Sequence, residues 1–122
     1  MADNSGQAAE SKARQFLSDQ GLMWLHSNFR CKRGELDLVM LDGQSLVFIE
    51  VRARSNGRFA SASQSVDWRK QKRLTLAAGV FLKQFPQHQC RPCRFDVIAY
   101  DGNPQDWGQP RWIRQAFEPA II

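Results

Sequence analysis

The 122-residue sequence contains few cysteines and no long apolar run, and these two features argue against a disulfide-rich protein and a membrane-spanning protein. Three cysteines form an odd set, so a disulfide framework is not expected. No segment approaches the roughly 18 consecutive apolar residues that a membrane helix needs. The first residues lack a basic start followed by an apolar stretch, so no signal peptide is visible. We therefore expect a cytoplasmic protein that has no membrane partner.

The cysteines also offer little to a structural metal. Cys90 and Cys93 form a C-x-x-C pair, and the other candidate ligands are His88 nearby and, farther along the chain, Cys31 and His26. A structural zinc ion needs four converging ligands, and the second pair is not spaced as a pair. We interpret the three cysteines as reduced, mostly buried thiols.

What the sequence does have is apolar mass and positive charge. Hydrophobic residues make up 43% of the chain, which is enough for the core of one domain of ordinary size. We expect residues 1–122 to form a single domain with flexible tails at 1–5 and 118–122.

Lys and Arg outnumber Asp and Glu by 17 to 12. That excess favours a polyanionic partner such as a nucleic acid, although an ordinary basic surface would give the same count.

Hydrophobic spacing predicts two helices, over residues 7–20 and 66–85. Ser5 is the expected cap of the first helix and Gly21 its end, while Pro86 stops the second. The second helix is expected to bury one apolar stripe, made of Leu74, Ala77, Ala78, Phe81 and Phe85.

Five strands are predicted, over residues 22–29, 35–41, 46–51, 93–100 and 111–117. The first is expected at or near a sheet edge, and the continuously apolar third at the centre, covered on both faces. Asp42 and Gly43 predict a hairpin turn, and the Ser-, Gly- and Arg-rich segment 53–65 predicts a mobile basic loop. The order α-β-β-β-α-β-β indicates the α/β class, with a mixed β-sheet flanked by helices.

Two acidic residues, Asp37 and Glu50, lie inside predicted strands, where a buried carboxylate is unfavourable. Asp37 is flanked by Leu36 and Leu38, which are expected to share the opposite face of their strand, and Glu50 lies near the end of the central strand. Burying a carboxylate is costly unless it is paired or binds a metal. Side-chain alternation places Glu50 and Arg52 on one face of the central strand.

Two carboxylates on adjacent strands, with a backbone carbonyl from the Val51 peptide unit, would form a hard oxygen site suited to Mg²⁺. A metal there could polarise a phosphodiester, and Arg52 stands where a cation could stabilise the developing charge. The alternative is that both acids simply form ion pairs with Arg30, Arg33 or Arg52.

The pattern D-x(12)-E-V-R, from Asp37 to Arg52, resembles the catalytic signature of the PD-(D/E)xK nuclease superfamily. The wider pattern resembles the YraN family, an uncharacterised bacterial group similar to archaeal Holliday junction resolvases. The resemblance covers nearly the whole chain and is carried by GQAAESKA, NFRCKRGELDLV, LVFIEVRAR, SVDWRKQKRL, RFDVIAY and QAF. It implies a restriction-endonuclease-like fold.

The resemblance also implies roles for individual residues. Asp37 and Glu50 match the ligands of a Mg²⁺ or Mn²⁺ ion, and Glu10 matches an acid that resolvases bring to the metal from the first helix. Lys70 and Gln71 match a polar pair on the second helix that could reach the site. From the sequence alone, a solvated helix residue is the better interpretation of Glu10. Asp96 matches the acid of the RFDV strand, and we expect it to be structural and paired with Arg94 or a strand neighbour.

One departure concerns the third position of the signature, where the superfamily has lysine and this chain has Arg52. Lysine can lose its proton when it is buried, whereas arginine stays charged. Arg52 could orient the scissile phosphate or stabilise the transition state, but it could not act as a general base. Lys70 is the candidate for the missing amine, as migrated lysines are elsewhere in the superfamily.

The remaining basic residues are candidates for nucleic-acid contact. They are Arg54, Arg58, Arg69, Lys72 and Arg73. By spacing alone, those on the second helix form a basic face that serves phosphate contact or only solubility. Trp68, beside them, is the one tryptophan we consider for base stacking, although packing is favoured for it too. Trp24, Trp107 and Trp112 are expected to pack.

Three functions are therefore open. The first is a metal-dependent endonuclease acting on DNA, with branched DNA as one candidate substrate and with catalytic residues Asp37, Glu50, Arg52 and Lys70. The second is a non-catalytic nucleic-acid-binding domain on a nuclease-like scaffold, and the third is a structural or partner-binding protein. A symmetric homodimer would suit a four-way junction, since two cuts need two sites, but no stretch indicates an interface.

Overall fold

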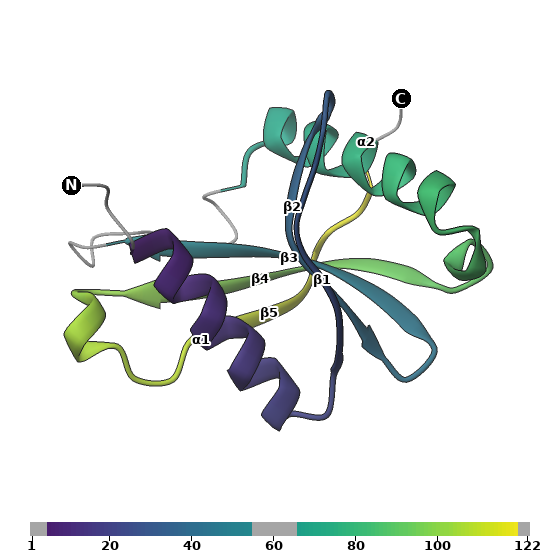
Figure 1. Ribbon diagram of the computed structural model, residues 1–122. Helices are drawn as coiled ribbons and strands as arrows, with labels where there is room; N and C mark the ends of the chain where they lie inside the picture. The colour runs from purple at the N-terminus through teal and green to yellow at the C-terminus, as the bar shows by residue number, and fades with distance from the viewer. Residues whose placement is uncertain (1–4, 55–65, 120–122) are drawn as a thin grey trace.

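The computed structural model describes residues 5–54 and 66–119 of the chain (Figure 1). Its elements are α1 (Ser5–Asp19), β1 (Met23–Cys31), β2 (Gly34–Asp42), β3 (Ser45–Arg54), α2 (Trp68–Gln84), the short 3₁₀ helix η2 (Pro86–His88), β4 (Cys93–Asp101), a second 3₁₀ helix η3 (Pro104–Asp106) and β5 (Arg111–Phe117). The order of helices and strands confirms the predicted α-β-β-β-α-β-β succession. Most of the predicted loop 53–65, and the outermost residues of both predicted tails, lie outside the described residues.

The five strands form one mixed sheet in the order β1-β2-β3-β4-β5. Neighbouring strands are antiparallel except for β3 and β4, which run parallel from Leu46↔Cys93 to Arg54↔Asp101. A parallel return requires a crossover, and α2 is part of this one. The prediction that β1 lies at an edge is confirmed, and β3 occupies the centre of the sheet as expected.

One helix covers each face of the sheet, as Figure 1 shows. Helix α1 buries Ala9, Ala13 and Leu17, spaced four apart, against the face that carries Val47 and Ile49 of β3. Helix α2 buries its stripe against the other face. That stripe is Leu74, Ala77, Ala78 and Phe81, as predicted, with Phe85 partly buried beside it. The central strand therefore contributes side chains to a core on each face of the sheet, which explains its continuous apolar run.

The predicted alternation along β2 is wrong at its beginning. Leu36 packs in the core beneath α2, whereas Leu38 packs in the core beneath α1. Alternation assumes a strand that stays flat against its neighbours. Here β2 pairs with β3 only from Asp42↔Ser45 to Leu38↔Ile49. Before Leu38 the hairpin of β1 and β2 bends away toward α2 (Figure 1), and the faces no longer alternate across the bend.

The helix ends depart from prediction by a few residues. Helix α1 begins at Ser5, so Ser5 is its first residue rather than a cap ahead of residue 7. Helix α2 begins at Trp68, and the Asp67 side chain accepts a hydrogen bond from the Lys70 N–H at 2.9 Å, a cap that the sequence pattern did not predict. Gly21 ends α1 with a φ of 100° that favours glycine.

Gly34, at the start of β2, is required by a close approach. Its φ is 156°, and a Cβ built there would lie 3.2 Å from the Arg73 carbonyl oxygen. A side chain would push the turn between β1 and β2 away from α2. This glycine therefore places the hairpin tip directly on the first half of α2.

None of the described helices has the length and apolar character needed to cross a lipid bilayer.

The expectation of buried thiols is wrong for two of the three cysteines. Cys90 and Cys93 are exposed, at the turn after η2 and at the start of β4, and Cys31 is partly buried. All three are free thiols.

Candidate carboxylate site

The point where β2 leaves β3 is the point where the two predicted acids meet. After the Leu38↔Ile49 pair, the Asp37 side chain takes over the role of a main-chain acceptor: its Oδ2 accepts the Val51 N–H at 2.9 Å. The carboxyl group of Asp37 therefore extends the ladder by one hydrogen bond. This contact fixes the side chain at the fork between the two strands.

Asp37 and Glu50 are buried there, 8% and 5% exposed, and the charge of Glu50 acts on the Asp37 carboxyl group. Two neighbouring buried carboxylates repel each other, which disfavours the ionised form of Asp37. Burial, and after it the charge of Glu50, raises the pKa of Asp37 to about 8. The fold thus places two carboxyl groups together, and Asp37 adds a second negative charge to the site when it loses its proton.

Two cations flank the pair on the α2 side. The Glu50 Oε2 atom lies 3.3 Å from the Arg52 Nε and 3.4 Å from the Lys70 Nζ. Glu50 and Arg52 share a face of β3, as predicted, while Val51 packs on the α1 side. Lys70 comes from the first turn of α2, which is 20 residues away in sequence but directly over Glu50 in space.

These ion pairs decide between the partners considered from the sequence. Glu50 pairs with Arg52, which is one of the three arginines proposed for an ion-pair network. Arg30 pairs instead with Glu35 on the surface, at 3.3 Å. Arg33 lies exposed in the turn between β1 and β2.

Glu10 reaches the pair from α1. It is partly buried, and it lies beside the Asn28 side chain at the surface end of the row. Burial, opposed by the neighbouring Asn28 side chain, raises the pKa of Glu10 above the usual range. The three acids therefore lie in a row from Glu10 through Asp37 to Glu50. Across residues 5–54 and 66–119, no three His, Cys, Asp or Glu side chains are grouped closely enough to enclose a metal ion.

The Glu10 end of the row opens to the surface. Glu10 and Asn28 line two adjoining depressions of about 160 and 380 Å³ between α1 and β1. The second of them is also bordered by Arg30 and Glu35. A ligand approaching from solvent would meet the carboxyl row from this side.

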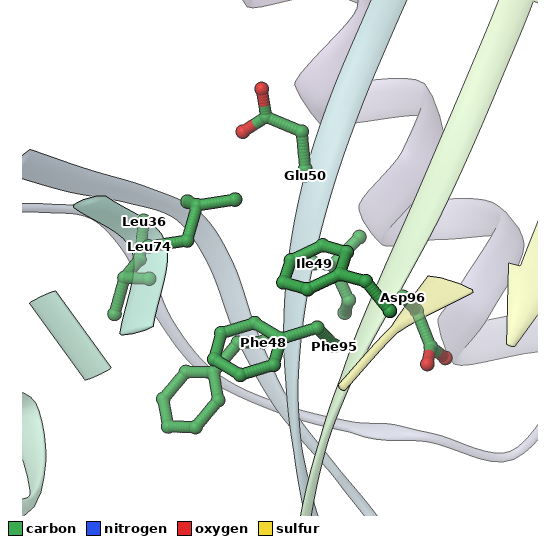
Figure 2. A pocket seen from close by; sticks show the side chains of 8 residues that line it. Leu36, Phe48, Ile49, Glu50, Leu74, Phe95 and Asp96 are labelled. Atoms are coloured by element: carbon green, nitrogen blue, oxygen red, sulfur yellow. The ribbon is translucent and has the colours of Figure 1, made fainter. Parts of the chain in front are cut away.

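The other end of the site meets the core. Figure 2 shows the residues around an interior gap beneath α2, where the Glu50 carboxyl group points away from the apolar rings of Phe48 and Phe95. The gap leaves no room for a water molecule. Asp96 also borders it but points to the far side of the sheet, so it does not belong to the carboxyl row.

Asp96 is structural, as expected. It is fully buried and accepts hydrogen bonds from the Arg94 guanidinium, from the Trp112 Nε1 and from the main-chain N–H of Gln115. Arg94 is also bound to Asp42 at 2.9 Å. The Asp96 carboxylate therefore fastens β5 to the sheet.

The predicted nucleic-acid contacts are only partly described. Arg69, Lys72 and Arg73 are exposed along α2, beside the turn that Gly34 brings against that helix. Arg54 is the last residue of β3, and its side chain lies outside the description. Arg58 lies outside the described residues altogether.

Two of the four tryptophans pack as expected, whereas Trp24 and Trp68 are exposed. Trp107 stacks on Tyr100, and Trp112 makes an edge contact with Phe16. Trp24 is partly exposed and is covered by the Arg14 guanidinium, 3.8 Å from its ring centre. Trp68, by contrast, is 66% exposed at the start of the basic helix.

Asn28 is the site residue that sequence reasoning missed. Its backbone has a φ of 54°, which L-residues rarely adopt within a strand and which asparagine tolerates better than most. The available signal was the residue type itself, since asparagine is depleted from strand interiors.

Fold and site together define a mixed α/β protein with a buried carboxyl pair at the fork between an edge hairpin and the central strand. The family model described as "Uncharacterised protein family UPF0102" matches residues 9–100, and the chain belongs to that family. A UPF0102 protein of Pseudomonas entomophila strain L48 is 54% identical over 115 residues, covering 93% of both chains. A second, from Pseudomonas putida strain GB-1, is 51% identical over 114 residues, with the same coverage.

Proposed function

We propose that the protein is a metal-dependent endonuclease acting on DNA, with a divalent cation, Mg²⁺ or Mn²⁺, held by Asp37 and Glu50. The observation that carries the proposal is the pair of neighbouring buried carboxyl groups on adjacent strands, with two cations against one of them. The resemblance of the D-x(12)-E-V-R pattern to the PD-(D/E)xK signature points the same way.

The donor set fits a hard divalent cation. Carboxylate oxygens are the ligands that Mg²⁺ prefers, and Asp37 and Glu50 supply them. Glu10, which the family resemblance assigns to the metal, lies at the edge of the row and is not grouped with the pair closely enough to enclose an ion in this structure. Burial, and after it the charge of Glu50, raises the pKa of Asp37, and a bound cation would favour the ionised form of this carboxyl group. Lewis-acid polarisation of a phosphate oxygen is the chemistry that such a cation supplies.

The chain's own residues would then divide the remaining work. Arg52 stays protonated, so it is suited to orient a phosphate and to stabilise charge that develops on it. Lys70 is the only amine described beside Glu50, so it is the candidate for proton transfer at the site. The exposed cations of α2, Arg69, Lys72 and Arg73, would bind the phosphates of the flanking backbone.

A second candidate is a non-catalytic nucleic-acid-binding domain. It is favoured by the ion pairs of Glu50, because Arg52 and Lys70 already neutralise a carboxylate that the first candidate assigns to a metal. This candidate predicts binding that needs no metal and weakens steeply as salt is raised.

A single cleavage experiment separates the two. The purified protein is incubated with labelled four-way junction, single-stranded and linear duplex DNA in Mg²⁺, Mn²⁺ or chelator. Asp37→Asn and Glu50→Gln are the test variants, because the amide oxygen that replaces the Asp37 carboxylate could still accept the Val51 N–H. Asp101→Asn, which changes an exposed acid at the end of β4, is the matched control.

We expect cleavage that requires metal, is lost in both test variants and persists in the control. Nuclease signal that survives Asp37→Asn would indicate a contaminant and refute the assignment. Binding of DNA without cleavage in any metal would establish the second candidate instead. The preferred substrate, branched or linear, would be read from the same gel.

A further inference from the structure

Trp68, the first residue of α2, is the most exposed of the large apolar side chains that the structure describes, at 66%. The other two exposed ones within residues 5–54 and 66–119, Met23 and Trp24, lie at the start of β1. The register of β1 on β2 places them at the opposite end of the hairpin from its turn. Trp68 is therefore a single exposed ring that no described apolar patch surrounds.

The exposed residues that share its helix face are cations. Lys72 lies one turn after Trp68, and Arg69 and Arg73 occupy the adjoining part of the same face, since residues four apart are neighbours on a helix. All three of these cations are exposed. The buried stripe that begins at Leu74 lies on the other side of α2, against the sheet.

The turn between β1 and β2 adds two more cations to this surface, because Lys32 and Arg33 are exposed there. Gly34, the next residue, lies so close to α2 that a Cβ would be 3.2 Å from the Arg73 carbonyl oxygen, and Figure 1 shows the hairpin against the first half of that helix. The ring and the cations therefore belong to one surface. We call it the cationic platform: Trp68, Arg69, Lys72, Arg73, Lys32 and Arg33.

The acids beside the cationic platform are already engaged. Asp67 accepts the Lys70 N–H at 2.9 Å as the cap of α2, and Glu35 pairs with Arg30 at 3.3 Å. A surface of this charge attracts the phosphates of a nucleic acid. The core of a protein interface is, by contrast, depleted of charged residues. A single ring among cations therefore fits a nucleic acid better than a protein partner.

We propose that Trp68 stacks on an unpaired base of the bound DNA while the cations of the platform bind the neighbouring phosphates. Stacking needs an open base face, and inside a duplex the neighbouring base pairs cover both faces. The substrate class is therefore DNA that contains unpaired bases. Lys70, in the same turn of α2, lies 3.4 Å from Glu50, so a base on Trp68 keeps its backbone close to the carboxyl pair. This inference deepens the proposed function and rests on its nucleic-acid binding rather than on its metal.

The test measures DNA affinity by fluorescence anisotropy in chelator, so that no metal-dependent step contributes. The probes are a labelled single strand, the duplex of the same sequence, and an abasic single strand that keeps the phosphates without the bases. Trp68→Ala removes the ring, and Trp68→Phe keeps a smaller one. Trp24→Ala is the matched control, because it removes a partly exposed tryptophan outside the cationic platform.

We expect Trp68→Ala to weaken binding of the single strand about 10-fold, the scale of one base stacked on an aromatic ring. Trp68→Phe should recover most of that loss. Binding of the duplex and of the abasic strand should change little, because neither offers an open base face along its length. The slope of affinity against salt should stay as in the wild type, whereas Lys72→Gln should weaken binding of all three probes and lower that slope by about 1.

The outcomes separate this inference from the proposed function. Wild-type affinity for the single strand in Trp68→Ala overturns the stacking role and leaves the endonuclease assignment standing. An equal loss on the abasic strand, or in Trp24→Ala, marks an effect on charge or on the fold and also overturns it. Binding that depends on Trp68, without cleavage in any metal, supports the stacking role and refutes the endonuclease assignment. A wild-type protein that binds none of the probes overturns both.

Discussion

The buried carboxyl pair should make the protein less stable as pH rises toward neutrality, and replacing Asp37 by asparagine should remove that dependence. The folded protein holds the Asp37 proton up to a pKa of about 8, whereas the unfolded chain releases it near the ordinary value of 3.8. Between those values the unfolded state binds fewer protons than the folded state. The free energy of unfolding therefore falls with increasing pH across this window and stops falling above the folded pKa.

The magnitude follows from about 1.4 kcal/mol per pH unit for a full proton. Between pH 5 and pH 7 the wild type should lose about 1–3 kcal/mol relative to Asp37→Asn through this group. The Asp37→Asn substitution keeps the size of the side chain, and its amide oxygen can still accept the Val51 N–H, so the ladder contact is retained. The advantage of the variant should consequently grow with pH rather than appear as a constant offset.

Urea denaturation followed by tryptophan fluorescence, at several pH values with chelator present, measures this difference directly. Asp101→Asn removes an exposed acid and should follow the wild type at every pH. Parallel curves for the wild type and Asp37→Asn would refute the reasoning, because they would mean that the Asp37 proton is not held in the folded state.

Three further predictions concern the metal, the buried anchor and the hairpin contact. Millimolar Mg²⁺ at a pH of about 7.5 should raise the melting temperature of the wild type but not of Asp37→Asn, since ligand binding to the folded state stabilises it; equal shifts in a thermal-shift assay would contradict a site at Asp37. Asp96→Ala should destabilise the fold by about 3 kcal/mol, because it leaves the partly buried Arg94 and Trp112 donors without their acceptor; a change below about 1 kcal/mol in urea denaturation would show that Asp96 is not an anchor. Gly34→Ala should cost about 1–2 kcal/mol, because its Cβ would crowd the Arg73 carbonyl oxygen; unchanged stability would mean that the hairpin relaxes freely.

The sequence was most informative where local periodicity and chain order decide the structure. The two helical stripes, the edge position of β1 and the shared face of Glu50 and Arg52 all depend on spacing within one element. The Asp96–Arg94 pair also lies within a single strand, two residues apart. Such features need no knowledge of how distant segments meet.

Features that depend on a bend or on a long-range contact were out of reach. Leu36 and Leu38 pack in different cores because β2 separates from β3 at this point, and no pattern in the sequence predicts where the two strands separate. Lys70 was placed near the site only through family resemblance, because spacing cannot show which residue of the crossover helix contacts Glu50. The left-handed backbone of Asn28 likewise depends on the tertiary setting.

The hydrogen bond from the Val51 N–H to Asp37 has a consequence for how related sequences should be interpreted. This aspartate serves the architecture of the sheet as well as any chemistry, so a homologue that had abandoned catalysis would still benefit from an acceptor at this position. The contacts of Glu50 are with charged side chains, and they give the sheet nothing comparable. If the proposed nuclease activity holds, divergence at the glutamate, rather than at the aspartate, would therefore be the earlier sign that a lineage had lost it.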